Sequence, residues 1–247
     1  MQAFSYQQSP YSVREDLGQA YREFWSQLAK PGSWWTGAQR VAIARETRNA
    51  VNCDFCEKRR RALSPYTFPG EHEHDDGLDP LAVDAVHRII TDQSRITLSY
   101  IQDNEAKGFS REQYVELAGI AVVTFSIDEF NRALGLPLEA LPEPEHGEPT
   151  HYRPNHAVEG TGFVPMIPAD GNVGLEADLW PDGVNANVLR AFSLVPDAVR
   201  EWMQVGSAQY LSIAGMQIFA GDTGRSIDRM QIELVAARVS SINECFY

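Results

Sequence analysis

The sequence predicts an all-α fold, and two observations support this prediction. Apolar residues recur at spacings of three and four along most of the chain, whereas the alternating apolar and polar runs typical of strands are scarce. The 247 residues are 43% hydrophobic and include five Trp. A chain of this size and composition can bury a core within one or two domains.

The first part of the chain predicts three helices. The first covers residues 11–30, where the apolar side chains form one stripe, and the Pro-Gly pair that follows ends it. The second is expected from about Thr36 to Val51. The third is expected to begin near Cys53 and to end before Pro65, where a loop rich in Pro, Gly and charge follows.

The next part predicts two longer helices. Residues 79–106 are interpreted as one long helix, with Gly108 as its stop. Ser110 and Gln113 have the spacing of a capping box, which predicts the start of a second helix. Gly135 fits the end of that helix, because glycine readily adopts the left-handed conformation found after helix ends.

The pattern changes after residue 136. Residues 137–154 contain five Pro and cannot continue as a helix, so they predict an extended connector. Residues 160–174 are too apolar for a free linker and are expected to pack across a helical surface. Helical patterning resumes near Ala186 and returns in the last segment, from Ser226 onward.

The charge and hydropathy of the chain argue against two classes of partner. The net charge is −13, from 34 acidic and 21 basic side chains, so the average field repels a phosphate backbone and no nucleic-acid partner is expected. No apolar run approaches the roughly 20 residues of a spanning helix, so no membrane partner is expected. The first residues lack a basic region followed by an apolar run, and a cytoplasmic location is therefore expected.

The three cysteines are Cys53, Cys56 and Cys245. An odd number without an export signal argues against a disulfide framework, and Cys-x-x-Cys indicates redox or metal chemistry. At the start of a helix, free N–H groups and the helix dipole favour the reactive thiolate. Arg60 follows Cys56 by four residues, so its guanidinium is expected to lie over that thiol and lower its pKa.

Two other interpretations of the Cys-x-x-Cys pair stay open. The two cysteines would serve as small buried apolar residues if the Arg run were only a solvated face. A zinc site with His72 and His74 would have an irregular Cys-x2-Cys-x15-His-x-His spacing. We therefore expect neither a metal nor another cofactor.

An internal repeat appears when Cys53 is aligned with Cys245, a shift of 192 residues (245 minus 53). In both copies a helix leads into the cysteine, with an Asn close before it. The segment QIELVAARVSSINECFY resembles the active-site entry of the alkylhydroperoxidase D/carboxymuconolactone decarboxylase superfamily. That pattern has a Glu twelve residues before the first Cys of Cys-x-x-Cys and a His four residues after the second. Glu233 stands twelve residues before Cys245.

The resemblance extends over most of residues 15–140 and 185–247. The segment LRAFSLVPDAVREWMQV is similar to the helix pair before the motif, and FSREQYVELAGIAVVTFSIDEFNRALGLPLE to the helix that closes a module. The resemblance implies tandem helical modules at residues 11–140 and 185–247. Residues 141–184 would then connect them and pack on both.

The resemblance also implies a thiol peroxidase. The second Cys of the motif would attack a hydroperoxide, the first would resolve the product to a disulfide, and Glu and His would relay the proton. A thiol reductant would complete the cycle. By this correspondence Glu233 is the relay acid and Cys245 the resolving thiol, and the attacking residue would directly follow Tyr247. We expect that residue to be selenocysteine, with the chain as given truncated there and weakly active. The alternative is an ordinary cysteine at that position, lost by truncation.

The N-terminal module departs from the family pattern. Val41 stands where the pattern has Glu, and Arg60 stands where it has His, so this module keeps both sulfurs and is expected to lack the relay. In the C-terminal module, the apolar residues Leu234, Val235, Val239 and Ile242 would lack covering helices. Exposed stripes of this kind tend to pair, so we expect a homo-oligomer, as the family's usual association also implies.

Two functional alternatives remain. One is a non-enzymatic helical scaffold whose redox sites are degenerate. The other is a cysteine-independent decarboxylase of the same superfamily, for which His87 is the only well-placed histidine. We interpret His87 instead as an ordinary core or surface histidine.

Overall fold

The structure is a computed structural model that describes residues 3–64, 67–74, 77–160, 162–181 and 186–243. Within these ranges it contains helices and no strand, which confirms the all-α prediction. The one β-type pairing described is an isolated antiparallel bridge between Val158 and Met166. No helix among the described residues is long and apolar enough to cross a membrane.

Ten α-helices are described, and three short 3-10 turns lie between or before them. The helices of the first half are α1 (Glu15–Leu28), α2 (Gly37–Ala50), α3 (Asp54–Arg61), α4 (Pro80–Thr91), α5 (Leu98–Ala106) and α6 (Arg111–Ala133). Those of the second half are α7 (Asn187–Arg190), α8 (Pro196–Gln209), α9 (Ile213–Met216) and α10 (Arg229–Ile242).

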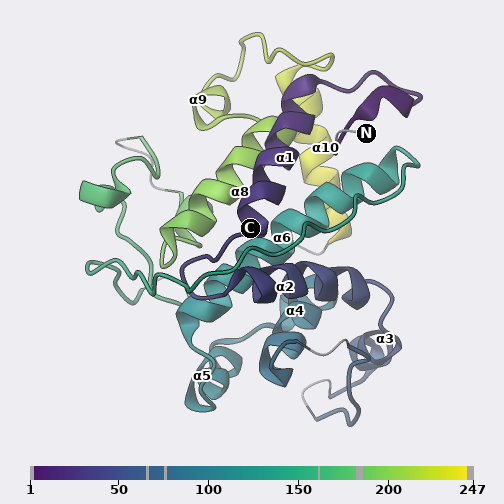
Figure 1. Ribbon diagram of the computed structural model, residues 1–247. Helices are drawn as coiled ribbons and strands as arrows, with labels where there is room; N and C mark the ends of the chain where they lie inside the picture. Colours follow the sequence, from purple (N-terminus) through teal and green to yellow (C-terminus); the bar gives the residue numbers. More distant parts are fainter. Residues whose placement is uncertain (1–2, 65–66, 75–76, 161, 182–185, 244–247) are drawn as a thin grey trace.

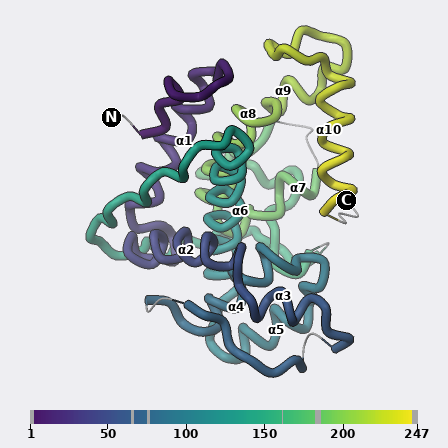
Figure 2. The backbone as a smooth tube through the Cα atoms, turned by 90° about the vertical axis from the view of Figure 1, so that its right-hand side faces the viewer, coloured from purple at the N-terminus to yellow at the C-terminus, as the bar shows by residue number. Residues whose placement is uncertain are grey.

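Helix α6 is the centre of the arrangement (Figure 1). It packs against α2 and α4, which also pack against each other, and it contacts α8, which runs along α1. Figure 2 shows α3, α4 and α5 together at one end of the molecule, with α1, α8 and α10 toward the other. Residues of the first and last thirds of the sequence therefore share one packed body.

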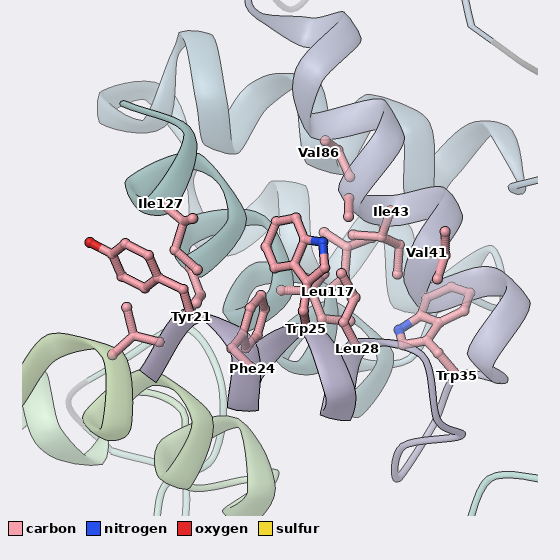
Figure 3. Close-up of a cluster of buried hydrophobic side chains, with 14 of the residues drawn as sticks. Tyr21, Phe24, Trp25, Leu28, Trp35, Val41, Ile43, Val86, Leu117 and Ile127 are labelled. Carbon is pink, nitrogen blue, oxygen red and sulfur yellow. The ribbon is translucent and has the colours of Figure 1, made fainter. Parts of the chain in front are cut away.

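The core lies where α1, α2, α4 and α6 meet (Figure 3). The predicted stripe of the first helix faces inward, with Tyr21, Phe24 and Leu28 fully buried. Leu117 and Ile127 of α6 are fully buried in the same cluster. Complete burial of a side chain of this size stabilises the fold by roughly 1.5–3 kcal/mol, so this cluster is a main source of stability.

The prediction of one long helix over residues 79–106 is wrong. Helix α4 ends at Thr91, and Asp92 leaves the helical conformation with a φ of −154°. A 3-10 turn follows, and α5 begins after Thr97, whose hydroxyl accepts a hydrogen bond from the backbone N–H of Tyr100. The chain breaks here because Thr91, Asp92 and Thr97 favour capping and turn conformations over a helix interior.

Helix α6 begins with the predicted capping box. The Ser110 hydroxyl accepts from the Gln113 N–H at 3.1 Å, and the Gln113 side chain accepts from the Ser110 N–H at 3.0 Å. The capping box therefore satisfies two donors that would otherwise have no partner. At the other end of the helix, Gly135 has a φ of 69°, a conformation that costs glycine little.

Replacing Ser110 with alanine is expected to destabilise the protein by about 1 kcal/mol, because an N–H of the first turn loses its acceptor. Urea unfolding, followed by circular dichroism, measures this change. Ser110→Asp keeps an acceptor at the same position and should stay within about 0.5 kcal/mol of the wild type. Equal stability of the alanine and aspartate variants would contradict the role of the cap.

The segment after α6 lies against the helices without forming one. Its backbone donates hydrogen bonds from Glu145 N–H to the Ala29 carbonyl and from His151 N–H to the Ser33 carbonyl. Farther along, Ile167 and Trp180 are buried and pack on α8. The proline-rich residues thus follow the loop between α1 and α2, and the more apolar residues cover α8.

Helix α10 carries an exposed apolar face. Leu234 is 71% exposed, Val235 57%, Val239 51% and Ile242 64%. These are the side chains that the sequence predicts to be without covering helices. The expected homo-oligomer stays a prediction.

A cysteine–histidine cluster as the candidate functional site

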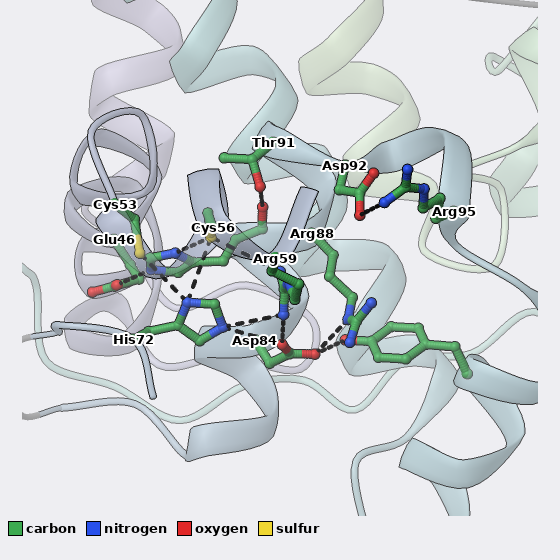
Figure 4. Close-up of polar contacts among 12 residues, drawn as sticks. Glu46, Cys53, Cys56, Arg59, His72, Asp84, Arg88, Thr91, Asp92 and Arg95 are labelled. Atoms are coloured by element: carbon green, nitrogen blue, oxygen red, sulfur yellow. Dashed lines mark hydrogen bonds and ion pairs between the residues drawn. The ribbon is translucent and has the colours of Figure 1, made fainter. Parts of the chain in front are cut away.

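Four side chains converge at the end of the molecule formed by α3 and α4. Cys53 precedes α3, Cys56 lies in its first turn, His72 lies in the loop after it, and His87 lies on α4. One donor atom from each lies within 4.8 Å of the others. We call these four residues the Cys–His cluster (Figure 4).

The backbone positions the two cysteines differently. After α2, the Cys53 N–H donates to the Ala50 carbonyl at 3.3 Å, and this turn sets Cys53 as the N-cap residue of α3. Cys53 is half-buried, whereas Cys56 is only 2% exposed because its helix packs on α4. The first sulfur is therefore near solvent and the second lies in the protein interior.

His87 connects the buried sulfur to a buried carboxylate. His87 Nδ1 lies 3.2 Å from Cys56 Sγ, and Nε2 lies 2.6 Å from a Glu46 carboxylate oxygen. His87 is fully buried and Glu46 is 2% exposed. A carboxylate at Nε2 favours the tautomer with its proton there, which leaves the Nδ1 lone pair directed at Cys56.

His72 makes a parallel arrangement on the other side of the sulfurs. Its Nδ1 lies 3.6 Å from Cys53 Sγ and 3.5 Å from Cys56 Sγ, and its Nε2 lies 3.1 Å from Asp84. Burial lowers the pKa of His72, and the neighbouring Arg59 adds to this effect against the hydrogen bond to Asp84. The imidazole is therefore neutral at neutral pH, with a lone pair directed at both sulfurs.

Asp84 is held as a carboxylate by several donors. Arg59 donates to it at 2.6 Å, Arg88 at 2.8 Å and the Tyr100 hydroxyl at 2.8 Å. Burial alone would raise the pKa of the Asp84 carboxyl, but the hydrogen bond from His72 and the Arg88 guanidinium outweigh it and hold the pKa far below its usual range. Asp84 thus fixes the orientation of His72.

The Cys56 thiol does not have the low pKa that its place near a helix start led us to expect. Burial raises its pKa to about 12, and the neighbouring Arg59 only partly opposes this. The position expected for Arg60 is also wrong, since Arg60 is exposed and Arg59 lies beside the sulfur, with Nη2 3.8 Å from Cys56 Sγ. Desolvation of a thiolate outweighs a nearby guanidinium whose charge is already paired with Asp84.

No known family model, curated protein or solved structure matches this chain. The chemistry of the Cys–His cluster therefore has to follow from its geometry. That geometry corrects the expectation that Cys53 and Cys56 have no acid–histidine pair beside them. Val41 is a core residue and Arg60 is exposed, but Glu46 and His87 supply the two groups from other positions.

The residues predicted for the C-terminal site do not join this cluster. Cys245 lies outside the described residues. Glu233 lies on α10, where it pairs with Arg229 at 2.5 Å and accepts a hydrogen bond from the Tyr210 hydroxyl. Figure 2 shows α10 apart from α3 and α4.

Two cavities adjoin the cluster. One of about 420 Å³ has His72 in its wall, together with Phe55, Phe68 and Val83. The other, of about 410 Å³, has Cys53 in its wall and is lined mainly by polar side chains. Small molecules can therefore approach the half-buried sulfur from one side and the His72 ring from the other.

Proposed function

We propose that the chain is a thiol-dependent oxidoreductase that reduces hydroperoxides at Cys53 and Cys56. The observation that supports this most directly is the chain of contacts from Glu46 through His87 to Cys56. A nucleophile in contact with a base, which a third group orients, is the general arrangement for activating a side chain that is unreactive by itself.

The proton of Cys56 leaves during the attack in this proposal. The thiol is buried and protonated, so no stored thiolate is available. His87 accepts the proton at Nδ1 as the sulfur approaches the peroxide, and Glu46 stabilises the resulting imidazolium at Nε2. This removes the need for a free thiolate in a site that disfavours charge.

The chemical steps balance with two thiols and one hydroperoxide. Cys56 sulfur attacks the terminal peroxide oxygen, the O–O bond breaks, and the leaving alkoxide takes the proton from His87 to become an alcohol. Cys56 is then a sulfenic acid. The Cys53 thiol attacks that sulfur, water leaves, and a disulfide forms. Two thiols are oxidised and one hydroperoxide is reduced to an alcohol and water.

The surroundings of the two sulfurs support these roles, with Cys56 as the attacking thiol and Cys53 as the resolving thiol. Phe55, Phe68 and Val83 give the 420 Å³ cavity apolar wall segments among charged side chains such as Arg59 and Arg88, and these segments suit the organic part of a hydroperoxide. The ring of His72 lies between that cavity and Cys56, so it has to turn aside for the peroxide to reach the sulfur. Cys53 is the more exposed sulfur, where an external dithiol would attack the disulfide and restore both thiols.

Peroxide-dependent loss of the two thiols tests the proposal. In a Cys245→Ser background, an organic hydroperoxide is expected to consume both remaining thiols and to yield one alcohol per chain. Thiols are counted with a chromogenic disulfide, and the alcohol by chromatography. Cys56→Ser should abolish the reaction, whereas Cys53→Ser should leave a sulfenic acid that dimedone traps.

Two results would contradict this proposal. The first is thiol loss no faster than that of free cysteine under the same conditions, which would instead favour a helical scaffold. The second is a sulfenic acid trapped on Cys53 in the Cys56→Ser variant with the wild-type rate. That outcome would leave the relay without a role.

A further inference from the structure

We infer that the reduced Cys–His cluster is a binding site for a zinc ion, with Cys53, Cys56, His72 and His87 as its four ligands. This inference does not depend on the proposed peroxidase activity, because it concerns the same side chains before any oxidation. It also differs from the zinc site considered from the sequence, in which His74 stood in place of His87.

The distances between the donor atoms fit a single tetrahedral ion. Bond lengths of about 2.3 Å to sulfur and 2.0–2.1 Å to nitrogen place sulfur and nitrogen ligands of one zinc about 3.5 Å apart. Three of the four sulfur–nitrogen distances at the cluster are 3.2, 3.5 and 3.6 Å. All four atoms lie within 4.8 Å of one another, so one ion can contact them together.

The partners of the two histidines fit a metal site equally well. Both rings direct Nδ1 at the sulfurs, and both have a carboxylate at Nε2, which is Glu46 for His87 and Asp84 for His72. A metal-bound histidine usually donates its other N–H to a carboxylate or a carbonyl, and this contact fixes its tautomer and raises its basicity. One such pair occurs in many enzymes, but two pairs that converge on two sulfurs are expected mainly of a metal centre.

The chemistry and burial of the ligands favour zinc in a closed site. Two thiolates and two imidazoles are the ligand set of tetrahedral structural zinc, whereas magnesium and calcium prefer oxygen. Cys56 and His87 are buried, and four protein ligands leave no position for water. Binding releases the two thiol protons, and the ion then balances the charge of the two thiolates.

Zinc and peroxide would compete for the same sulfurs. A hydroperoxide and two protons convert the zinc-bound dithiolate into a disulfide, an alcohol, water and a free zinc ion. Two electrons leave the sulfurs and reduce the O–O bond. This release step rests on the proposed function, whereas zinc binding to the reduced chain does not.

Metal binding to the reduced full chain tests the inference. A Cys245→Ser protein is stripped with a chelator, kept under a thiol-free reductant and titrated with zinc against a chromogenic chelator. We expect one zinc per chain, and cobalt(II) in its place should give the intense visible absorption of a tetrahedral thiolate site. His87→Gln and Cys56→Ser should weaken binding about 100-fold or more, and Asp84→Asn about 10–100-fold.

His74→Gln is the matched control, because His74 stands two residues from His72 in the same loop and is exposed. Its affinity for zinc should equal that of the wild type. Absence of binding by the wild-type chain, or weaker binding by His74→Gln with none lost by His87→Gln, would overturn the inference. The wild-type cobalt spectrum decides the ligand type even where a variant folds poorly.

The two proposals fail separately. Zinc binding is measured without peroxide, and peroxide-dependent thiol loss is measured with chelator and without zinc. A protein that binds zinc but keeps its thiols in peroxide has only the metal site. A protein that loses its thiols rapidly but binds no zinc has only the redox site.

Discussion

Replacing His87 with glutamine is expected to slow the peroxide-dependent oxidation of Cys56 by about 10²–10⁴-fold, the usual contribution of a positioned base. Glutamine is similar in size and carries an amide donor for the Glu46 carboxylate, which contacts Nε2 of His87 in the wild type. It offers no base at the position of Nδ1, 3.2 Å from the sulfur. The time course of thiol loss, measured with chelator present, gives the rate.

Glu46→Gln supplies a second test of the same relay. Its amide can donate to Nε2 of His87, so the ring proton moves to Nδ1 and the lone pair facing Cys56 is lost. The rate should therefore fall although His87 is still present. His146→Gln, a change of the same kind at an exposed residue that lines neither cavity, should keep the wild-type rate. A His87→Gln rate equal to that of the wild type would show that the contact has no catalytic role.

The helices could largely be predicted from local patterns. The stripe on α1 and the capping box of α6 depend on neighbouring residues, and both are present as predicted. The break after Thr91 was missed because the apolar spacing of residues 79–106 continues across it. There the chain starts a new helix instead, and the Thr97 hydroxyl caps it by accepting a hydrogen bond from the Tyr100 N–H. Apolar spacing alone does not register such a cap.

The site was only half predictable. The Cys-x-x-Cys pair is a local signal, but the groups that act on Cys56 come from α2 and α4, and His87 stands 31 residues after it. A fixed spacing along the chain cannot find such partners. One signal was present, because Glu46 lies three residues from Ile43 and four from Ala50, on a face that is fully buried. A carboxylate on a buried face needs a partner.

The prediction that Arg60, and not Arg59, lies beside Cys56 failed for a similar reason. Residues three and four positions after Cys56 lie on nearly the same face of a helix, so spacing alone does not separate them. Asp84 decides between them, because its carboxylate pairs with Arg59 at 2.6 Å on the side where α3 meets α4. Arg60 then lies on the exposed side. Tertiary contacts therefore assign the role that periodicity left undetermined.

Replacing Arg40 with methionine is expected to destabilise the protein by about 3–5 kcal/mol, the cost of leaving a buried charge without its partner. Arg40 is 2% exposed and joins Glu116 of α6 at 2.5 Å to Glu201 of α8 at 2.7 Å. Burial raises the pKa of Glu116 against the pull of Arg40, so this carboxylate depends on the guanidinium. Urea unfolding measures the loss in free energy.

The neighbourhood of Arg40 explains why methionine cannot substitute. A Cβ on Gly32 would lie 1.9 Å from a Glu116 oxygen, so the backbone of the loop lies directly against this ion pair. Glu116 also accepts from the Trp34 N–H at 2.6 Å and cannot turn toward solvent without breaking that bond. The unpaired carboxylate therefore stays buried in the variant and carries the full desolvation cost.

Two further variants separate this cost from lost packing. Arg40→Met combined with Glu116→Gln and Glu201→Gln removes all three charges and keeps an acceptor for Trp34, so it should recover part of the stability lost by Arg40→Met alone. Arg61→Met removes an arginine that pairs with Glu57 on the exposed face of α3 and should cost at most about 1 kcal/mol. If Arg40→Met were as mild as Arg61→Met, the buried ion pair would not hold α2, α6 and α8 together.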